Sequence, residues 1–467
     1  MGDLIQALGD IVGPAHVLVG DDISLHYGHD EALTVTPVMP LAVLRPATTA
    51  EVVGLVRLAG EQRVPVVARG SGTGLSGAAV AVAGCLLVSF ERMAAIVEID
   101  TANHVAVVQP GVTLAQLDEA TAVHGLVYPV FPGENSASLG GNVATNAGGM
   151  RAIKYGVTRH QVLGLEAVLA GGDVIRTGGK FVKSSTGYDL TQLIVGSEGT
   201  LALVTEATLR LYPRPGHAAT VLAPFATLDE VAGAVPEVVG RGVAPRILEY
   251  VDALTMAAIT GNVGLDLGIP PDVRDNAAAY LVAVLESTHE DRLDDDVTML
   301  GDLLTGRGAI DVYVLPPQAA QQLIEAREKA FFVAKAAGAD DIVDVVVPRA
   351  EIPRYLARVA ALAQSHGALV TGCGHVGDGN VHLSVFQPDA ERRHQLLMAM
   401  FGAGLECGGA ISGEHGLGTE KKEYFMALED PAKIALLRRI KAAFDPDGLL
   451  GPGRIFDEPG HDHGEAR

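Results

Sequence analysis

Three histidines and one glutamate near the C-terminus have the residue types and spacing of a metal site. His375 and His382 flank a Gly-Asp-Gly-Asn turn, so the chain can double back and direct both imidazoles at one point. Further along, Glu414 and His415 are adjacent and lie between glycines. Two histidines and one carboxylate with open coordination positions form the ligand set of a catalytic divalent ion such as zinc. The other interpretation is that these histidines only satisfy hydrogen bonds in a core.

A glycine-rich segment at residues 69–77 has the composition of a phosphate-binding loop. It reads RGSGTGLSG and contains a G-x-G-x-x-G pattern that begins at Gly72. That dinucleotide-binding pattern requires a long helix directly after it, because the pyrophosphate sits on the helix N-terminus. Here Gly84 and the strand-like residues 86–90 follow instead. The segment therefore predicts either an ordinary turn or a loop whose own amides wrap a diphosphate.

A second loop at residues 132–149 has the same character, with the sequence PGENSASLGGNVATNAGG. Small residues let the backbone approach a flat polar ligand closely, while Ser, Thr and Asn supply directional hydrogen bonds. A third segment, residues 195–207, joins a glycine turn to a strand. Two such loops in one domain favour ligand binding over ordinary turns.

Helices and strands must position these loops, and they alternate from about residue 40 to residue 212. Capping-box pairs, which start helices, occur at Thr48 with Glu51, Thr113 with Gln116, and Thr227 with Glu230. Short β-branched stretches predict strands at residues 64–67, 86–89 and 105–108. This half of the chain is therefore expected to mix α and β structure.

The sequence YPRPG at residues 212–216 is the clearest breaker in the middle of the chain, and we place a domain boundary there. Beyond it the pattern predicts fewer strands and longer helices, for example at residues 352–365 and 431–444. The acidic run at residues 290–296 is interpreted as a solvated helix or loop face, and residues 457–467 as a disordered tail.

Composition excludes several classes of protein. The 467 residues carry a formal net charge of -22, which would repel nucleic acid and anionic lipid. The longest uncharged apolar stretch, residues 78–90, is too short to span a bilayer. Three well-separated cysteines offer neither an iron–sulfur ligand set nor a disulfide framework. We therefore expect a cytoplasmic protein with no nucleic-acid partner and no membrane span.

Six segments taken in order resemble those of a known family. They are RGSGTGLSG, GENSASLGGNVATNAGG, KSSTGYDLTQLIVGSEGTLALVTEATLRL, GCGHVGDGNVH, ISGEHGLG and FDPDGLLGPGRIF. They resemble the vanillyl-alcohol-oxidase-type (PCMH-type) FAD flavoproteins, and within them the FAD-linked D-2-hydroxyacid dehydrogenases that oxidise D-lactate, glycolate or D-2-hydroxyglutarate. The resemblance covers roughly residues 35 to 456.

The resemblance implies an α+β fold in which a PCMH-type FAD-binding domain precedes a ferredoxin-like α+β substrate (cap) domain. A C-terminal helical segment then returns to the FAD domain. The expected divisions are an N-terminal helical segment at 1–34, the FAD-binding domain at 35–214, the cap domain with the metal site at 215–420, the returning segment at 421–456 and the tail at 457–467.

The resemblance also implies that FAD is held with the first loop on its pyrophosphate and the second loop beside the flavin. Some relatives tether the flavin through a histidine in the first loop, but residues 69–77 hold neither His nor Cys, so noncovalent FAD is expected. The residues expected to bind FAD are Arg69, Gly70, Ser71, Gly72, Thr73, Gly74, Leu75, Ser76, Pro132, Gly133, Ser138, Gly141, Asn142, Thr145, Asn146, Gly149, Glu198, Gly199 and Val204.

In the C-terminal half, the resemblance makes His375, His382 and Glu414 ligands of a divalent metal, expected to be zinc, and His415 the general base. An α-hydroxyl has a high pKa that coordination to a cation lowers, so a neutral histidine can take its proton as hydride leaves carbon for flavin N5. The expected reaction is oxidation of a D-2-hydroxyacid to the 2-oxoacid.

Substrate binding is assigned to Arg327 and Asn380, with Arg327 matching a family arginine for the substrate carboxylate. Relatives that oxidise 2-hydroxyglutarate carry a lysine a few residues before a proline. Aligned on Pro348, this neighbourhood at residues 340–344 holds three acids and no lysine. The departure favours a monocarboxylate such as lactate, glycolate or a longer aliphatic 2-hydroxyacid, although another cation could replace the lysine.

Two alternatives stay open at this point. One is an FAD oxidase or alkyl-transferring enzyme on the same fold, which would not need the two-histidine, one-glutamate set. The other is a flavin subunit of a multi-subunit complex of the glycolate oxidase kind. The sequence holds neither iron–sulfur ligands nor a nicotinamide motif, so the expected electron acceptor is oxygen, a quinone or a separate carrier protein. A homodimer is one possible assembly.

Overall fold

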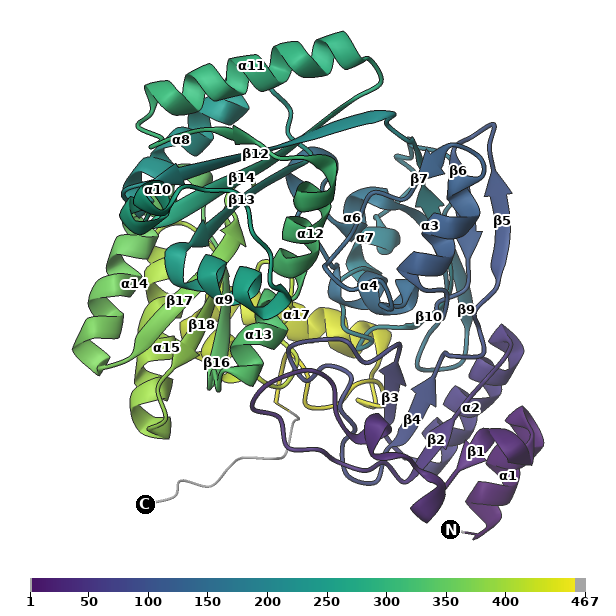
Figure 1. Ribbon diagram of the computed structural model, residues 1–467. Coiled ribbons are helices and arrows are strands. Elements are labelled where there is room, and N and C mark those ends of the chain that lie inside the picture. Colours follow the sequence, from purple (N-terminus) through teal and green to yellow (C-terminus); the bar gives the residue numbers. More distant parts are fainter. Residues whose placement is uncertain (1, 458–467) are drawn as a thin grey trace.

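The computed structural model describes residues 2–457 and shows an α+β fold with two parts (Figure 1). Most of the tail expected at residues 457–467 lies outside the described residues. The first part, purple to blue, carries two larger sheets and a two-stranded one, and the second, teal to green, carries one large sheet. No helix within residues 2–457 is both long enough and apolar enough to cross a membrane.

The first sheet of the N-terminal part is mostly parallel and supports the first glycine loop. Its strand order is β1 (Val17–Leu18), β2 (Ala42–Leu44), β4 (Leu86–Ser89) and β3 (Val66–Arg69). The strand predicted at 64–67 thus begins two residues later, because the amide of Val64 still closes the end of the preceding helix by donating to Ala59 O. The glycine loop starts directly after β3 and is followed by β4, not by a long helix.

The second sheet is antiparallel, with strand order β5 (Ile96–Asp100), β6 (Val105–Val108), β10 (Leu203–Arg210), β8 (Val162–Val168) and β9 (Val174–Gly178). Short helices α4 (Leu139–Thr145), α5 (Ala152–Tyr155), α6 (Thr158–Gln161) and α7 (Leu190–Ile194) lie between these strands along the chain. The breaker at 212–216 holds only the two-residue strand β11 (Tyr212–Pro213), which pairs with β7 (Leu126–Val127).

The three predicted capping sites each begin a helix. Helices α3 (Leu114–Ala122) and α8 (Leu228–Gly240) have complete capping boxes, in which side chain and backbone exchange both hydrogen bonds. Helix α2 (Thr49–Gln62) is capped by Thr48, but the Glu51 carboxylate accepts from the amide of Ala47 instead of that of Thr48.

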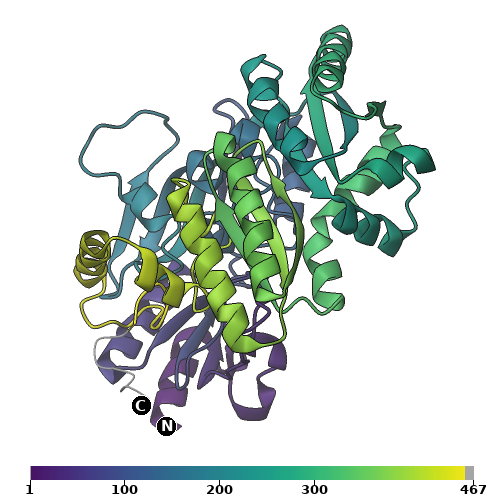
Figure 2. The ribbon, with the colours of Figure 1, turned by 90° about the vertical axis from the view of Figure 1, so that its left-hand side faces the viewer.

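The C-terminal part is built on one antiparallel sheet of seven strands. Their order is β15 (Tyr313–Val314), β12 (His217–Phe225), β14 (Ala279–Ser287), β13 (Ile247–Asp252), β17 (Leu369–His375), β18 (Asn380–Phe386) and β16 (Asp341–Val346). One face packs on α8, α11 (Glu290–Gly306), α14 (Ile352–His366) and α15 (Ala390–Glu406), and α14 and α15 run in front of the sheet in Figure 2. The acidic run at 290–296 forms the first turns of α11.

The other face of this sheet packs on α9 (Ala253–Val263), α12 (Pro317–Glu328) and α13 (Ala330–Ala336). These helices lie on the side that faces the N-terminal part (Figure 1). Residues from this face, including Cys373 and Ala326, form a separate buried cluster. The space between this helical layer, the sheet and the glycine loops is where the candidate site lies.

After α16 (Lys422–Leu428) and α17 (Pro431–Phe444), the chain returns to the N-terminal part. Leu450 pairs with Val66 beside β3, and Lys441 Nζ donates to Thr200 O. The guanidinium of Arg454 donates to Ala78 O at 2.7 Å, just beyond the first glycine loop. The last helices therefore attach the C-terminal part to the loop region.

Candidate active site

The two glycine loops face each other across a cleft of about 170 Å³, which we call the loop cleft. Ser71 and Ser138 join the loops by exchanging hydrogen bonds, with each backbone N–H donating to the other hydroxyl at 3.0–3.1 Å. A Cβ at Gly70 would collide with the Ser138 hydroxyl. Glycine is therefore required there for the loops to approach.

Unpaired donors line the loop cleft. The backbone N–H groups of residues 72–75 donate to no atom within residues 2–457, and the buried Nδ2 of Asn142 likewise has no partner among them. Consecutive free amides form a nest for an anion such as a diphosphate. These groups fit the pyrophosphate and ring edges of a dinucleotide cofactor such as FAD.

The residues expected to bind FAD divide into three groups by position. Fifteen line the loop cleft: Arg69, Gly70, Ser71, Gly72, Thr73, Gly74, Leu75, Pro132, Ser138, Gly141, Asn142, Thr145, Glu198, Gly199 and Val204. Gly133 and Gly149 line the neighbouring cavity. Ser76 and Asn146 line neither: Ser76 donates to His415 O, and Asn146 ends α4 in the left-handed region.

Arg69 and Glu198 line the loop cleft, but their charged ends hold the protein together. The Arg69 guanidinium donates to the carbonyls of His26, His29 and Ala79. The Glu198 carboxylate accepts from the amides of Leu417 and Gly418 at 2.7 and 2.8 Å, and its burial raises its pKa. Glu198 therefore ties the N-terminal part to the loop that carries Glu414 and His415.

His375, His382 and Glu414 come together at the end of a hairpin. His375 ends β17 and His382 lies on β18, with a turn at 376–379 between them. Nε2 of each histidine lies 3.1 Å from Oε1 of Glu414. The three ligand atoms are within 4.8 Å of one another, as one metal ion requires. The donor set of two imidazoles and a carboxylate fits zinc or a similar divalent ion.

His382 also belongs to a second candidate ligand group, with Asp344 and His415. Asp344 is fully buried, and its Oδ2 already accepts from the amides of residues 413, 414 and 415 and from the Ser412 hydroxyl. This carboxylate oxygen is therefore occupied in holding the Glu414–His415 loop. The group of His375, His382 and Glu414 is the one we carry forward.

Sequence reasoning missed Glu249 and Asp344 as parts of this site. Glu249 lies on β13 with no exposed surface, and its carboxylate contacts Nδ1 of His375 at 2.5 Å and the Arg327 guanidinium at 2.6 Å. Burial opposes its charge, but Arg327 and His375 hold the pKa of Glu249 below its usual value. Asp344 was noted only as one of three acids. The sequence does offer one signal for them, an acid in the middle of an apolar strand. An unpaired buried charge is costly, so such an acid is expected to have a partner.

Asn380, which was expected to bind substrate, does not reach the cavity. Its side-chain amide is buried, donates to Asp344 Oδ1 at 2.8 Å and to Val345 O at 3.1 Å, and does not line the cavity. It therefore helps to position Asp344, which in turn holds the loop of Glu414 and His415.

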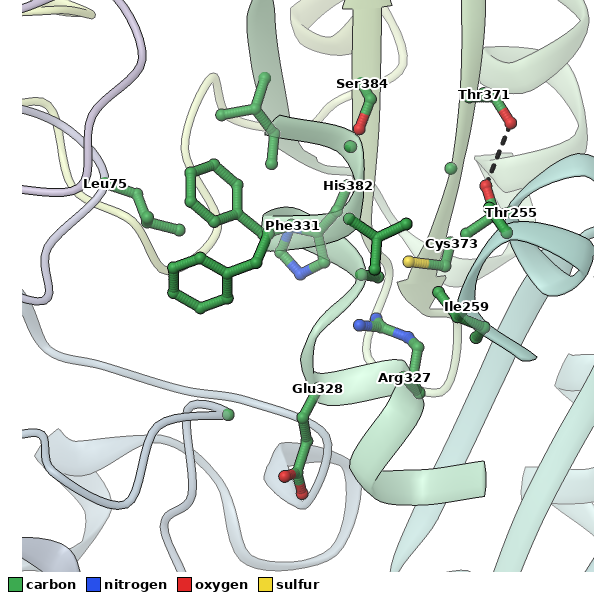
Figure 3. Close-up of a pocket in the computed structure, with 18 of the residues that line it drawn as sticks. Leu75, Thr255, Ile259, Arg327, Glu328, Phe331, Thr371, Cys373, His382 and Ser384 are labelled. Atoms are coloured by element: carbon green, nitrogen blue, oxygen red, sulfur yellow. Dashed lines mark hydrogen bonds between the residues drawn. The ribbon is translucent and has the colours of Figure 1, made fainter. Parts of the chain in front are cut away.

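Beside the loop cleft lies a cavity of about 450 Å³, which we call the cap cavity. Glu414 and His415 line both spaces, so they stand where the two meet. Arg327 and His382 extend into the cap cavity in Figure 3. Among its lining residues Arg327 is the only lysine or arginine. The arrangement can bind one carboxylate beside a metal ion and a histidine base.

His415 has the protonation state that a base needs. Burial lowers its pKa to about 4, so the imidazole is neutral at pH 7. Its ring stacks on His382 with centroids 5.0 Å apart. Nδ1 lies 3.8 Å from Asp344 and is buried without a hydrogen-bond partner among the described residues.

Family models match most of the chain. The model described as FAD linked oxidases, C-terminal domain, matches residues 214–455, and the model described as FAD binding domain matches residues 40–178. An uncharacterised FAD-linked oxidoreductase of Mycobacterium tuberculosis is 56% identical over 98% of this chain and 100% of its own length. A protein of Anaerostipes hadrus named D-lactate dehydrogenase is 34% identical over 95% of both chains, and a glycolate oxidase subunit of Bacillus subtilis is 36% identical over 97% of both.

Solved structures with the same fold are more distant. One is p-cresol methylhydroxylase with substrate bound, at 20% identity and a TM-score of 0.77, covering 98% of this chain and 97% of that one. Another is alkyldihydroxyacetonephosphate synthase, at 17% identity and a TM-score of 0.74, covering 97% and 86%. These two likenesses concern the fold.

Proposed function

Because this chain belongs to the FAD-linked oxidases, and within them to the FAD-linked D-2-hydroxyacid dehydrogenases, we propose that it oxidises a D-2-hydroxy monocarboxylic acid to the 2-oxoacid. One observation carries the proposal. The ligand group of His375, His382 and Glu414 lies beside a neutral histidine and one arginine, where the loop cleft meets the cap cavity.

Arg327, Glu249 and His415 each have a separate role in the proposed reaction. When bound, FAD supplies a two-electron acceptor and the divalent ion lowers the pKa of the substrate hydroxyl. Arg327 binds the substrate carboxylate, and the pair of Glu249 and Arg327 holds that guanidinium in place. Nδ1 of His415 faces Asp344, so Nε2 is the atom we assign to take the hydroxyl proton. The substrate loses that proton and a hydride, and a C–O double bond forms.

The charge of the cap cavity supports a monocarboxylate over a diacid. Its only lysine or arginine is Arg327, which already pairs with Glu249, whereas Glu134, Glu328 and Glu414 also line it. A second substrate carboxylate would therefore meet no free cation among the described lining residues. This agrees with the acids found at 340–344 where relatives that oxidise 2-hydroxyglutarate carry a lysine.

The proposal is tested by anaerobic bleaching of the flavin in the metal-loaded protein. We expect D-2-hydroxy monocarboxylic acids to reduce the flavin, and L-enantiomers and D-2-hydroxyglutarate to reduce it much more slowly. If no D-2-hydroxyacid bleached the flavin, the proposed reaction would be wrong. Three further expectations stay predictions. The electron acceptor is tested with quinones, oxygen and carrier proteins. The homodimer is tested by sedimentation, and the cytoplasmic location by cell fractionation.

A further inference from the structure

We infer that the preferred 2-hydroxyacid carries an extended alkyl side chain much longer than the methyl group of lactate. This inference rests on the proposed function and adds the shape and polarity of the substrate. It is drawn from the walls of the cap cavity beyond the metal ligands.

The floor of the cap cavity runs along two paired strands. Cys373, Thr371 and Leu369 are alternate residues on one face of β17, and they pair with His382, Ser384 and Phe386 of β18. All six line the cavity. Because alternate residues share one face and each rises about 3.3 Å, the floor from His375 to Leu369 is roughly 20 Å long. Figure 3 shows Thr371 and Ser384 beyond Cys373 and His382, on the side away from Glu328.

The walls along this floor are apolar. Helix α9 contributes Leu254, Ala258 and Ile259, and the segment that begins at α13 contributes Ala330, Phe331, Phe332, Val333, Ala334 and Ala337. Ile342 of β16 completes the set. An alkyl chain lying against these side chains would gain about 0.8 kcal/mol per buried methylene, or roughly fourfold in binding.

The polar groups along the floor are mostly engaged or neutral. The hydroxyls of Thr255 and Thr371 lie 3.0 Å apart, and Thr371 also donates to Asp252. The Cys373 thiol is buried and is only a weak hydrogen-bonding group. The Ser384 hydroxyl is the exception, since it has no hydrogen-bond partner within residues 2–457. A polar substrate side chain would thus find few free partners.

The far end of the cap cavity opens through exposed apolar side chains. Leu254, Phe332 and Leu369 are 54%, 42% and 50% exposed, and all three line the cavity. Exposed large apolar groups gathered at a cavity mouth mark a binding surface more often than a neutral part of the exterior. An alkyl chain that reaches this opening would cover them, whereas lactate or glycolate would leave the floor beyond Cys373 and His382 empty.

The test is a series of D-2-hydroxyacids, from lactate through 2-hydroxybutanoate and 2-hydroxyhexanoate to 2-hydroxyoctanoate. The measurement is the second-order rate constant of anaerobic flavin reduction by the metal-loaded protein. We expect it to rise about fourfold per methylene at first and to be about 10²–10³-fold higher for 2-hydroxyoctanoate than for lactate. A flat or falling series with active lactate would overturn this inference and leave the proposed function standing. If no acid of the series reduced the flavin, the proposed function would fail first.

A matched pair of variants locates the alkyl site. Ala258 lines the cap cavity and Ala257, its neighbour on α9, does not, and both are exposed. Ala258→Trp should lower the rate constant for 2-hydroxyoctanoate at least tenfold more than that for lactate, whereas Ala257→Trp should keep the wild-type ratio. An equal effect of Ala258→Trp on both substrates would contradict the placement. FAD content and melting temperature show whether each variant is folded.

Discussion

Nδ1 of His375 lies 2.5 Å from Oε1 of Glu249, a carboxylate with no exposed surface. A hydrogen bond from Nδ1 leaves the lone pair of Nε2 free, and Nε2 is the atom that faces Glu414. The other oxygen of Glu249 contacts Arg327 at 2.6 Å. One buried carboxylate on β13 therefore orients both a proposed metal ligand, His375, and the arginine proposed to bind substrate.

This relationship predicts the effect of Glu249→Gln. The amide keeps the shape but not the charge, so His375 loses the partner that fixes its ring and tautomer. Loss of such a partner typically weakens metal binding 10–100-fold. Competition with a fluorescent zinc chelator measures the affinity, and FAD content should stay near that of the wild type.

The matched control is Glu286→Gln. Glu286 is also a buried carboxylate in the same sheet and also pairs with an arginine, Arg246, but it contacts none of the proposed metal ligands. Its loss should lower the melting temperature without changing metal affinity. Equal metal affinity in Glu249→Gln and wild type would contradict the role of Glu249.

Metal removal should abolish turnover and leave FAD bound. Of the proposed ligands only Glu414 lines the loop cleft, whereas residues 72–75, whose amides are free, all line it. Dialysis against a chelator followed by metal analysis, flavin absorbance and anaerobic bleaching measures both parts. Zinc added back should restore bleaching. Full activity in metal-free protein would rule out the metal site as catalytic.

FAD should leave the protein on denaturation. A covalent flavin needs a nucleophilic side chain such as His, Cys or Tyr beside it. The loop cleft is lined by no cysteine, no tyrosine and one histidine, His415, which we assign as the base. Precipitation with acid should therefore release the yellow colour into the supernatant. Colour that stays with the precipitate would contradict noncovalent binding.

The two glycine loops and the grouping of the proposed metal ligands could be predicted from the sequence because their residue types are unusual where they stand. The glycine pattern that begins at Gly72 was expected to lack the long helix of a dinucleotide-binding fold. The structure confirms this, because the next element is the strand at 86–89. His375 and His382 are separated by a tight turn, so their proximity follows from local geometry. Glu414 joins them only through the fold.

Glu249 and Asp344 could not be predicted because their roles depend on sheet register. Glu249 is 126 positions from His375, and only the pairing of β13 with β17 brings them together. Asp344 lies opposite His382 in the pairing of β16 with β18. Neither acid has a local spacing signal. The expected role of Asn380 in binding substrate depends on the sheet register in the same way. In the structure its side-chain amide donates to Asp344.

A pH-dependent contribution to stability is predicted for Glu420. Burial, with the nearby carboxylates of Asp341 and Asp30, raises its pKa to about 7 from an ordinary value of 4.5. Between these two pH values the folded protein binds more protons at Glu420 than the unfolded chain does. The protonated carboxyl therefore contributes stability that is fully present below pH 4.5 and is lost as the pH rises through 7.

A glutamine at position 420 cannot ionise, so the Glu420→Gln variant should not lose this stability as the pH rises. Because the carboxyl is only partly buried, the gain should be small, about 1–3 °C in melting temperature at pH 8.5 and close to zero at pH 5. Thermal shift measurements at both values test it. The matched control Glu423→Gln changes an exposed carboxylate three positions away and should show no such difference. A gain that is equal at both pH values would contradict the assignment.

The last prediction concerns His415→Ala. A general base contributes typically about 10²–10⁴-fold, so anaerobic flavin reduction should slow by that order while metal and FAD contents stay near those of the wild type. Stopped-flow absorbance measures the reduction, and added imidazole should restore part of the rate because it can enter the space left by the ring. His394→Ala, which removes a histidine that does not line the cap cavity or the loop cleft, is the control. Loss of metal together with activity would instead place the ion on the group of Asp344, His382 and His415 and make His415 a ligand.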